Sequence, residues 1–157
     1  MSVELLHHGV GAVDVALMAD RALVGTFFAI SGAHKLFVPE YHKSVADLMR
    51  SLHIPFPRFN EWWVPLVEFS AGLGLLVGLL TPLAAAGLLT ICIVACCTDG
   101  PRRVRDMEEG SDGMQDPSEV VDDVLYLPEA MYAVLLAILV LAGPGRYSLD
   151  NLVSGWY

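Results

Sequence analysis

The stretch WWVPLVEFSAGLGLLVGLLTP, residues 62–82, is an almost unbroken apolar run that holds a single carboxylate, Glu68. Residues 62–80 approach the length of a helix that crosses the apolar core of a bilayer, about 20 mostly apolar residues. A charged side chain deep in such a helix costs about 2.5–3.5 kcal/mol on insertion scales, so it needs a partner, a proton or water. The stretch therefore predicts a membrane-spanning helix in which Glu68 has a specific role.

The composition of the whole chain is that of a membrane protein. Of its 157 residues 55% are hydrophobic and 17% are charged, and soluble domains average about 25% charged. Four apolar runs, at residues 19–38, 62–80, 82–98 and 126–143, are predicted to span the membrane. A soluble all-helical domain is the alternative, but four such runs would leave it too little polar surface. We therefore predict an all-α fold in which residues 1–157 form one integral membrane four-helix bundle.

The two long connections between the spans differ in character. Within the first, Val45, Leu48, Met49 and Leu52 recur at helical spacing, which predicts an amphipathic helix lying in the membrane interface. The second, residues 99–125, is rich in acidic residues and glycine, and we predict that it is a flexible loop.

The basic residues predict the orientation of the bundle. With four spans, both termini and the turn at 80–82 share one side, here called side A, and both long connections share side B. Side B carries seven Lys and Arg residues and side A carries two. Because basic residues favour the cytoplasmic side, side B is predicted to be cytoplasmic and both termini non-cytoplasmic.

Polar side chains from several spans are predicted to meet near side B. Glu68 lies six residues into its span, about 9 Å deep at 1.5 Å per residue. Lys35 shares a helical stripe with small residues that permit close approach, so it is the favoured partner of Glu68, with His34 second. Such a pair can merely hold two helices together, or it can face a ligand or handle protons. The candidate polar cluster comprises His34, Lys35, Trp62, Trp63, Glu68, Glu129 and Tyr132.

Two further groups of residues have predicted roles in the bundle. Close helix packing is predicted at Gly25, Gly32, Gly72, Gly74 and Gly78. On side A, Arg146 and Asp150 are four residues apart and Arg21 leaves the first span, which predicts a charged cap that joins the ends of the bundle. The cap can serve structure or function.

The sequence offers little for metals or cofactors. No metal-ligand spacing is recognisable, and His34 is the only histidine within a predicted span, so an internal haem with two histidine ligands is not supported. The glycines of residues 72–78 follow no strand, and they indicate helix packing rather than dinucleotide binding. We expect no resident metal and no nucleic-acid partner; the lipid bilayer is the expected environment.

Several stretches, in this order, resemble the DoxX family of small four-helix membrane proteins of bacteria and archaea. They are RALVGTFFAISGAHKLF (21–37), Ile-Pro-Phe-Pro (54–57), VEFSAGLGLLVGLLTPLAA (67–85) and GPGRYSLDNL (143–152). The resemblance singles out Arg21, Gly32, Lys35, Glu68, Gly72, Gly78, Glu129 and Arg146. Members are associated with quinone-linked thiosulfate oxidation, with complexes that handle thiol and radical stress, or with resistance to quinone-like electrophiles. The resemblance implies a bacterial plasma membrane and a quinone-linked redox setting.

Two functions of different classes follow. In the first, the chain is the quinone-facing subunit of a membrane oxidoreductase, and a partner subunit supplies the electrons because the chain shows no cofactor site of its own. In the second, it is an assembly subunit that anchors a partner, with the acidic loop as the docking element. A solitary proton-coupled transporter is a weaker third alternative, since four short helices leave little room for a gated path.

Overall fold

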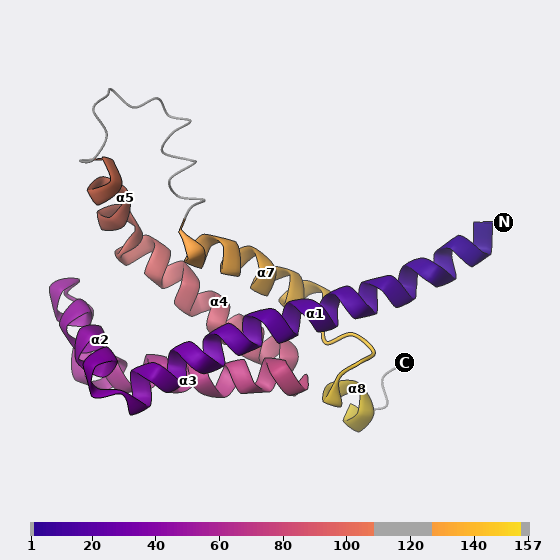
Figure 1. The fold of residues 1–157 in the computed structure, drawn as a ribbon, viewed down its shortest axis with the longest axis horizontal. Helices are drawn as coiled ribbons and strands as arrows, with labels where there is room; N and C mark the ends of the chain where they lie inside the picture. The colour runs from indigo at the N-terminus through magenta and orange to yellow at the C-terminus, as the bar shows by residue number, and fades with distance from the viewer. Residues whose placement is uncertain (1, 109–126, 155–157) are drawn as a thin grey trace.

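The computed structural model describes residues 2–108 and 127–154, and side chains within 11–105 and 127–153. All regular elements in these ranges are helices (Figure 1), which confirms the predicted all-α class. They are α1 (Ser2–Phe37), α2 (Pro39–Ser51), α3 (Pro57–Val77), α4 (Thr81–Thr98), α5 (Gly100–Glu108), α7 (Pro128–Ala142) and α8 (Leu149–Ser154).

The four long helices form two tight pairs. Helix α1 packs along α3, and α4 packs along α7, whereas contacts between the pairs are fewer. The pairs meet in a core that includes Val24, Leu75, Leu88, Leu136 and Leu139, none of which is exposed. Toward the end that carries α2 and α5, the two pairs diverge (Figure 1). This divergence leaves space between them on side B.

Glycines allow the close approach of α1 and α3. A Cβ added to Gly72 would lie 2.5 Å from the backbone nitrogen of Ala29 and 2.9 Å from the carbonyl oxygen of Gly25. A Cβ on Gly32 would lie 2.8 Å from the carbonyl oxygen of Pro65. These three glycines therefore occupy the helix contact predicted for them, as in other small-residue interfaces.

The two remaining glycines of the predicted packing set lie elsewhere. Gly74 faces the start of α4, where the nearest atoms to an added Cβ are the Leu79 carbonyl oxygen at 3.2 Å and the Ala84 Cβ at 3.7 Å. Gly78 ends α3 in the left-handed conformation, with φ of 69°, against Arg21 and Ser148. Because a side chain is strained at that φ, Gly78 serves the turn into α4 rather than a helix-helix face.

Several helix boundaries differ from those predicted. Helix α1 begins at Ser2 instead of residue 19, because residues 2–18 contain no proline and a helix can extend beyond the segment that a bilayer accommodates. The predicted amphipathic helix is present as α2. The predicted flexible loop at 99–125 instead begins with the helix α5, and residues 109–126 lie outside the described residues.

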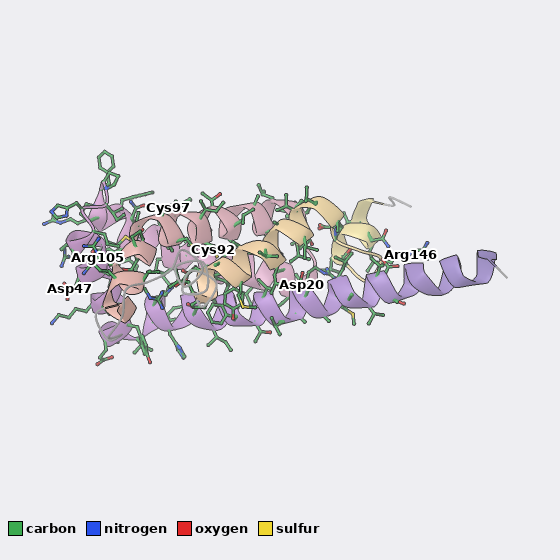
Figure 2. All side chains as sticks on the ribbon, turned by 90° about the horizontal axis from the view of Figure 1, so that it is seen from above. Asp20, Asp47, Cys92, Cys97, Arg105 and Arg146 are labelled. Carbon is green, nitrogen blue, oxygen red and sulfur yellow. The ribbon has the colours of Figure 1, made fainter. Side chains whose placement is uncertain are left out.

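Membrane-spanning capacity can be judged from length and composition. Among the described residues, α4 is the one helix that is long and apolar enough to cross a membrane, and the apolar α7 is shorter. The prediction that all four long helices cross the membrane therefore stays a prediction. Asp47 and Arg105 lie at the end of the molecule that carries α2 and α5, Arg146 lies toward the opposite end, and Asp20 lies between them (Figure 2).

Candidate functional site

A buried ion pair joins α1 to α3 near side B. The Lys35 Nζ lies 2.8 Å from Oε1 and 2.7 Å from Oε2 of Glu68, and the Ser31 hydroxyl donates to Oε2 at 3.3 Å. Glu68 is 4% exposed, whereas the side chain of Lys35 is 29% exposed. The favoured partner of Glu68 is thus the observed one. The second candidate, His34, instead stacks on Tyr41 with ring centroids 5.5 Å apart.

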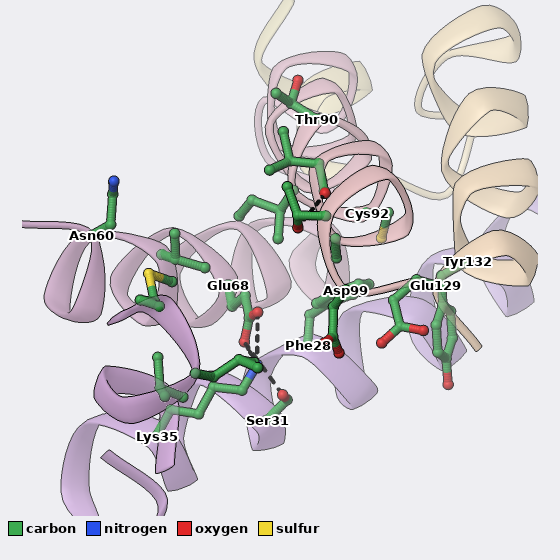
Figure 3. A pocket seen from close by; sticks show the side chains of 18 of the residues that line it. Phe28, Ser31, Lys35, Asn60, Glu68, Thr90, Cys92, Asp99, Glu129 and Tyr132 are labelled. Atoms are coloured by element: carbon green, nitrogen blue, oxygen red, sulfur yellow. Dashed lines mark hydrogen bonds and ion pairs between the residues drawn. The ribbon is translucent and has the colours of Figure 1, made fainter. Parts of the chain in front are cut away.

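The ion pair forms part of the wall of a cavity of about 430 Å³ between the diverging helix pairs. Its walls are mostly apolar, and they come from α1, α3, α4 and α7. In Figure 3, Asn60 and Tyr132 mark opposite ends of this space, with Glu68 and Lys35 between them. A concave apolar site of this volume with a few convergent polar groups is typical of small-molecule binding.

The α1/α7 side of the cavity is aromatic and acidic. The ring of Tyr132 stacks on Phe27 with centroids 4.3 Å apart and meets the edge of Phe28 at 5.5 Å. Glu129 lines the cavity and pairs with Arg103 of α5 at 2.8 Å. Of the predicted cluster, Lys35, Glu68, Glu129 and Tyr132 therefore come together around one cavity.

Helix α2 lines the side B end of the cavity, and α5 is fastened next to it. The apolar face of α2, with Val45, Leu48 and Met49, lines the cavity. Helix α5 is tied to α2 by the hydrogen bond from Arg102 Nη1 to the Ser51 hydroxyl, 3.1 Å long, and to α7 by the Arg103 ion pair. The face predicted to contact the membrane interface thus faces the cavity, at least in part.

Three residues of the predicted cluster do not line the cavity. Trp62 contacts the ring of His42 on α2, with centroids 4.2 Å apart, and Trp63 stacks on Phe59 at 5.6 Å. Both tryptophans are about half exposed, at 54% and 50%. Together with His34, they belong to the surface around α2, and the quinone-facing role predicted for them has no geometric support.

Other lining residues escaped the sequence prediction. Ser31 lies one helical turn before Lys35 on the same stripe, and this spacing could have identified it. Cys92 is 2% exposed and lines the cavity, but the sequence indicates only a small packing residue there. Asp99 lines the opening just after α4, where the sequence predicts the start of a loop. Among the described residues, no group of three or more His, Cys, Asp or Glu could hold a metal ion.

On side A, Arg21 and Asp150 connect the C-terminal segment to α1 and to the start of α4. Arg21 is 2% exposed, and its Nη2 donates to the Tyr147 carbonyl oxygen. The negative charge of Asp150 stabilises the positive charge of the Arg21 guanidinium group. The Asp150 carboxylate accepts from the backbone nitrogens of Leu80 at 2.6 Å and Thr81 at 2.8 Å, and so caps α4.

The predicted contact between Arg146 and Asp150 is replaced by another. Arg146 pairs with Asp14 of α1, with Nε 3.7 Å from Oδ2. The spacing of four residues is not helical here, because α8 begins only at Leu149. A charged cap is present, but its contacts differ from those the spacing predicts.

Large apolar side chains exposed on the outside of the long helices and one helix apolar and long enough to span a bilayer are features of a membrane protein. The family model for DoxX matches residues 16–98, more than half of the chain, and the chain belongs to the DoxX family. The matched segment contains both Lys35 and Glu68 but not α7. No curated protein and no solved structure matches the chain.

Proposed function

We propose that this chain is an integral membrane subunit that binds a quinone head group beside Glu68, within a quinone-linked oxidoreductase or redox-stress complex. One observation carries the proposal: a buried carboxylate, paired with a lysine, lines a largely apolar cavity of about 430 Å³. An ionisable pair inside a membrane bundle is costly, and it is by default a candidate for binding or proton transfer. The quinone itself is implied by the family resemblance.

The residues around the cavity fit the chemistry of quinone reduction. A quinone becomes a quinol by taking up two electrons and two protons. The Glu68 carboxylate can relay these protons one at a time, by taking up a proton from the water on side B and passing it to a quinone oxygen. The Lys35 ammonium group can polarise the same oxygen. Phe28 and Tyr132 offer ring faces and edges to the head group. The electrons come from a cofactor of a partner subunit.

The outer surface of the bundle supports embedding of all four long helices in the bilayer. Large apolar side chains are exposed on each of them, as at Ile30 (53%), Leu73 (43%), Val94 (48%) and Val134 (60%). Such apolar surface matches the acyl chains of lipids. The location that follows is the bacterial plasma membrane, with α2 at the cytoplasmic interface.

The orientation can be tested by cysteine labelling. In a chain whose native cysteines are replaced, single cysteines at the exposed positions Arg58 and Val153 report side B and side A. An impermeant maleimide should label Val153→Cys in intact cells, and Arg58→Cys only after lysis. The reverse pattern would invert the proposed orientation.

The decisive test of quinone binding replaces Glu68 by Gln. This change keeps the size of the side chain but removes its proton and charge, so quinone affinity and turnover of the intact complex should fall by about tenfold or more. Ser70→Ala is the matched control, because Ser70 lies exposed on α3 and bonds only to its own helix at the Leu66 and Val67 carbonyls. Unchanged affinity and turnover in Glu68→Gln would refute the proposal.

An assembly role is the second candidate. It is favoured by α5, which is fastened to α2 and α7 and leads directly into the acidic segment. In this role, deletion of residues 106–120 releases a partner protein, while Glu68→Gln mainly lowers stability. Pull-down from native membranes separates the two, because a quinone-linked complex brings a cofactor-bearing redox subunit with it.

A further inference from the structure

The boundary between α3 and α4 changes character along its length. On α4, the positions that face α3 are 84, 87, 91, 94 and 98, which follow the helical repeat. In the side A half these helices touch, since added Cβ atoms on Gly74 and Gly87 would lie 3.7 Å from Ala84 and Val67 respectively. The boundary is closed there.

In the side B half, the same stripe lines the cavity. Ile91, Val94 and Thr98 of α4 lie across from Val64 and Asn60 of α3 around this space. Val94 is nonetheless 48% exposed, and Thr90, which also lines the cavity, is exposed as well. Side chains that face both the cavity and the surroundings mark an opening, here called the α3/α4 seam and defined by Asn60, Val64, Thr90, Ile91, Val94 and Thr98.

The other boundaries of the cavity are built differently. On the α1/α7 side, the ring of Tyr132 is stacked on Phe27, which lines the cavity and is 42% exposed, and at the side B end the apolar face of α2 lines the cavity. Half of the α3/α4 seam is apolar (Val64, Ile91 and Val94), and the hydroxyls of Thr90 and Thr98 bond to carbonyl oxygens of their own helix. In the proposed bilayer embedding the seam faces acyl chains. An apolar tail in the seam would replace a lipid acyl chain and would pack against valine and isoleucine.

We propose that the ligand is a tailed, lipid-soluble quinone that enters laterally from the bilayer, with its apolar tail in the α3/α4 seam and its head group at Glu68. This inference rests on the proposed function. It distinguishes a quinone that resides in the membrane from a water-soluble quinone. A water-soluble quinone has no apolar tail to place beside Val64 and Val94.

The test compares two probes on the purified protein in lipid nanodiscs. One is a benzoquinone with a decyl tail, and the other carries the same head group without a tail; empty nanodiscs correct for partition into lipid. Val94→Trp fills the seam, and Ile138→Trp, on the exposed face of α7 (45%), is the matched control. Val94→Trp should lower the affinity for the tailed quinone by about tenfold and change the affinity for the tail-less quinone by less than about twofold. Ile138→Trp should change neither affinity.

Other outcomes are equally informative. If Val94→Trp weakens both probes equally, or weakens neither, the seam does not hold the tail and the inference is wrong. If the unmodified protein binds neither probe, the proposed function itself fails and the inference falls with it.

Photo-crosslinking provides a second measurement that does not depend on the folding of a variant. A decyl benzoquinone with a diazirine at the end of its tail should form adducts within residues 60–67 or 90–98. Adducts confined to residues 23–31 or 131–138 would place the tail on the α1/α7 side and overturn the inference.

Discussion

Helix α1 carries two cationic side chains about four turns apart on one face, the buried Arg21 and the partly exposed Lys35, and their surroundings differ sharply. Arg21, on side A, contacts the Tyr147 carbonyl oxygen and the charge of Asp150, both in the C-terminal segment. Lys35, on side B, contacts the side chains of α3 and α2, and a cavity lies beside it. A charged side chain inside the bundle therefore does not by itself identify a ligand-binding site. A cavity next to the charged side chain does.

The difference follows from how the two helix pairs meet. On side A, a short turn holds α3 against α4, and the Asp150 carboxylate caps that turn. On side B, no such turn joins the pairs among the described residues, and they diverge (Figure 1). We expect changes on side A to affect stability and changes on side B to affect ligand binding as well.

The largest loss of stability is expected for Arg21→Met. It removes the donor to the Tyr147 carbonyl oxygen and the positive charge that balances Asp150, and the loss of such a charge-assisted hydrogen bond costs about 3 kcal/mol. Unfolding of the purified protein in detergent measures this loss, and quinone affinity per folded molecule should not change. A loss below about 1 kcal/mol would show that Arg21 does not hold the C-terminal segment to the bundle.

A smaller loss, about 2–3 kcal/mol, is expected for Lys35→Met, because Lys35 is partly exposed while Glu68 is left buried and unpaired. Adding Glu68→Leu should restore much of the stability, since an apolar pair can replace a buried ion pair. Quinone binding should stay lost in the double variant. Recovery of binding together with stability would mean that the pair only holds the helices together.

The capping carboxylate can be tested with Asp150→Asn. The amide still offers one acceptor to the Leu80 and Thr81 nitrogens but loses its charge at the start of α4, so about 1 kcal/mol of stability should be lost. Thermal unfolding in detergent measures the change. The control is Asp47→Asn, which makes the same chemical change at an exposed pair with Arg50 and should change stability by less than about 0.5 kcal/mol.

The smallest effect is expected for Ser31→Ala. The Ser31 hydroxyl donates a long bond to Glu68, 3.3 Å, so its loss is worth about 0.5 kcal/mol, or about a twofold change in quinone affinity. Equilibrium binding in nanodiscs measures it, with Thr26→Ala, whose hydroxyl bonds to the Ala22 carbonyl on the same helix, as the control. A tenfold loss would instead indicate direct contact between Ser31 and the ligand.

Much of the helical framework can be predicted from the sequence, since apolar runs and their breaks are local features. The pairing of Lys35 with Glu68 follows from stripes of small residues, because these decide which helix faces approach closely. The depth of a residue along its helix does not determine the direction in which its side chain points, however. Trp62 and Trp63 lie about 120° and 140° around α3 from Glu68 at ideal helical geometry, and so they point away from the cavity.

Other features depend on tertiary arrangement and could not be predicted. The cavity exists because two helix pairs diverge, and no single stretch encodes that angle. The partner of Arg146 was missed because the spacing of Arg146 and Asp150 predicts a contact only within a helix, and the backbone before Leu149 is not helical.

The divergence of the two helix pairs has a mechanical consequence in a membrane. In the proposed embedding, the spread of the pairs toward side B would give the bundle a larger area in the leaflet on that side than in the other. A ligand that pushes the pairs apart would increase that area against the lateral pressure of the lipids. We therefore expect the proposed binding to depend on the lipid composition of that leaflet.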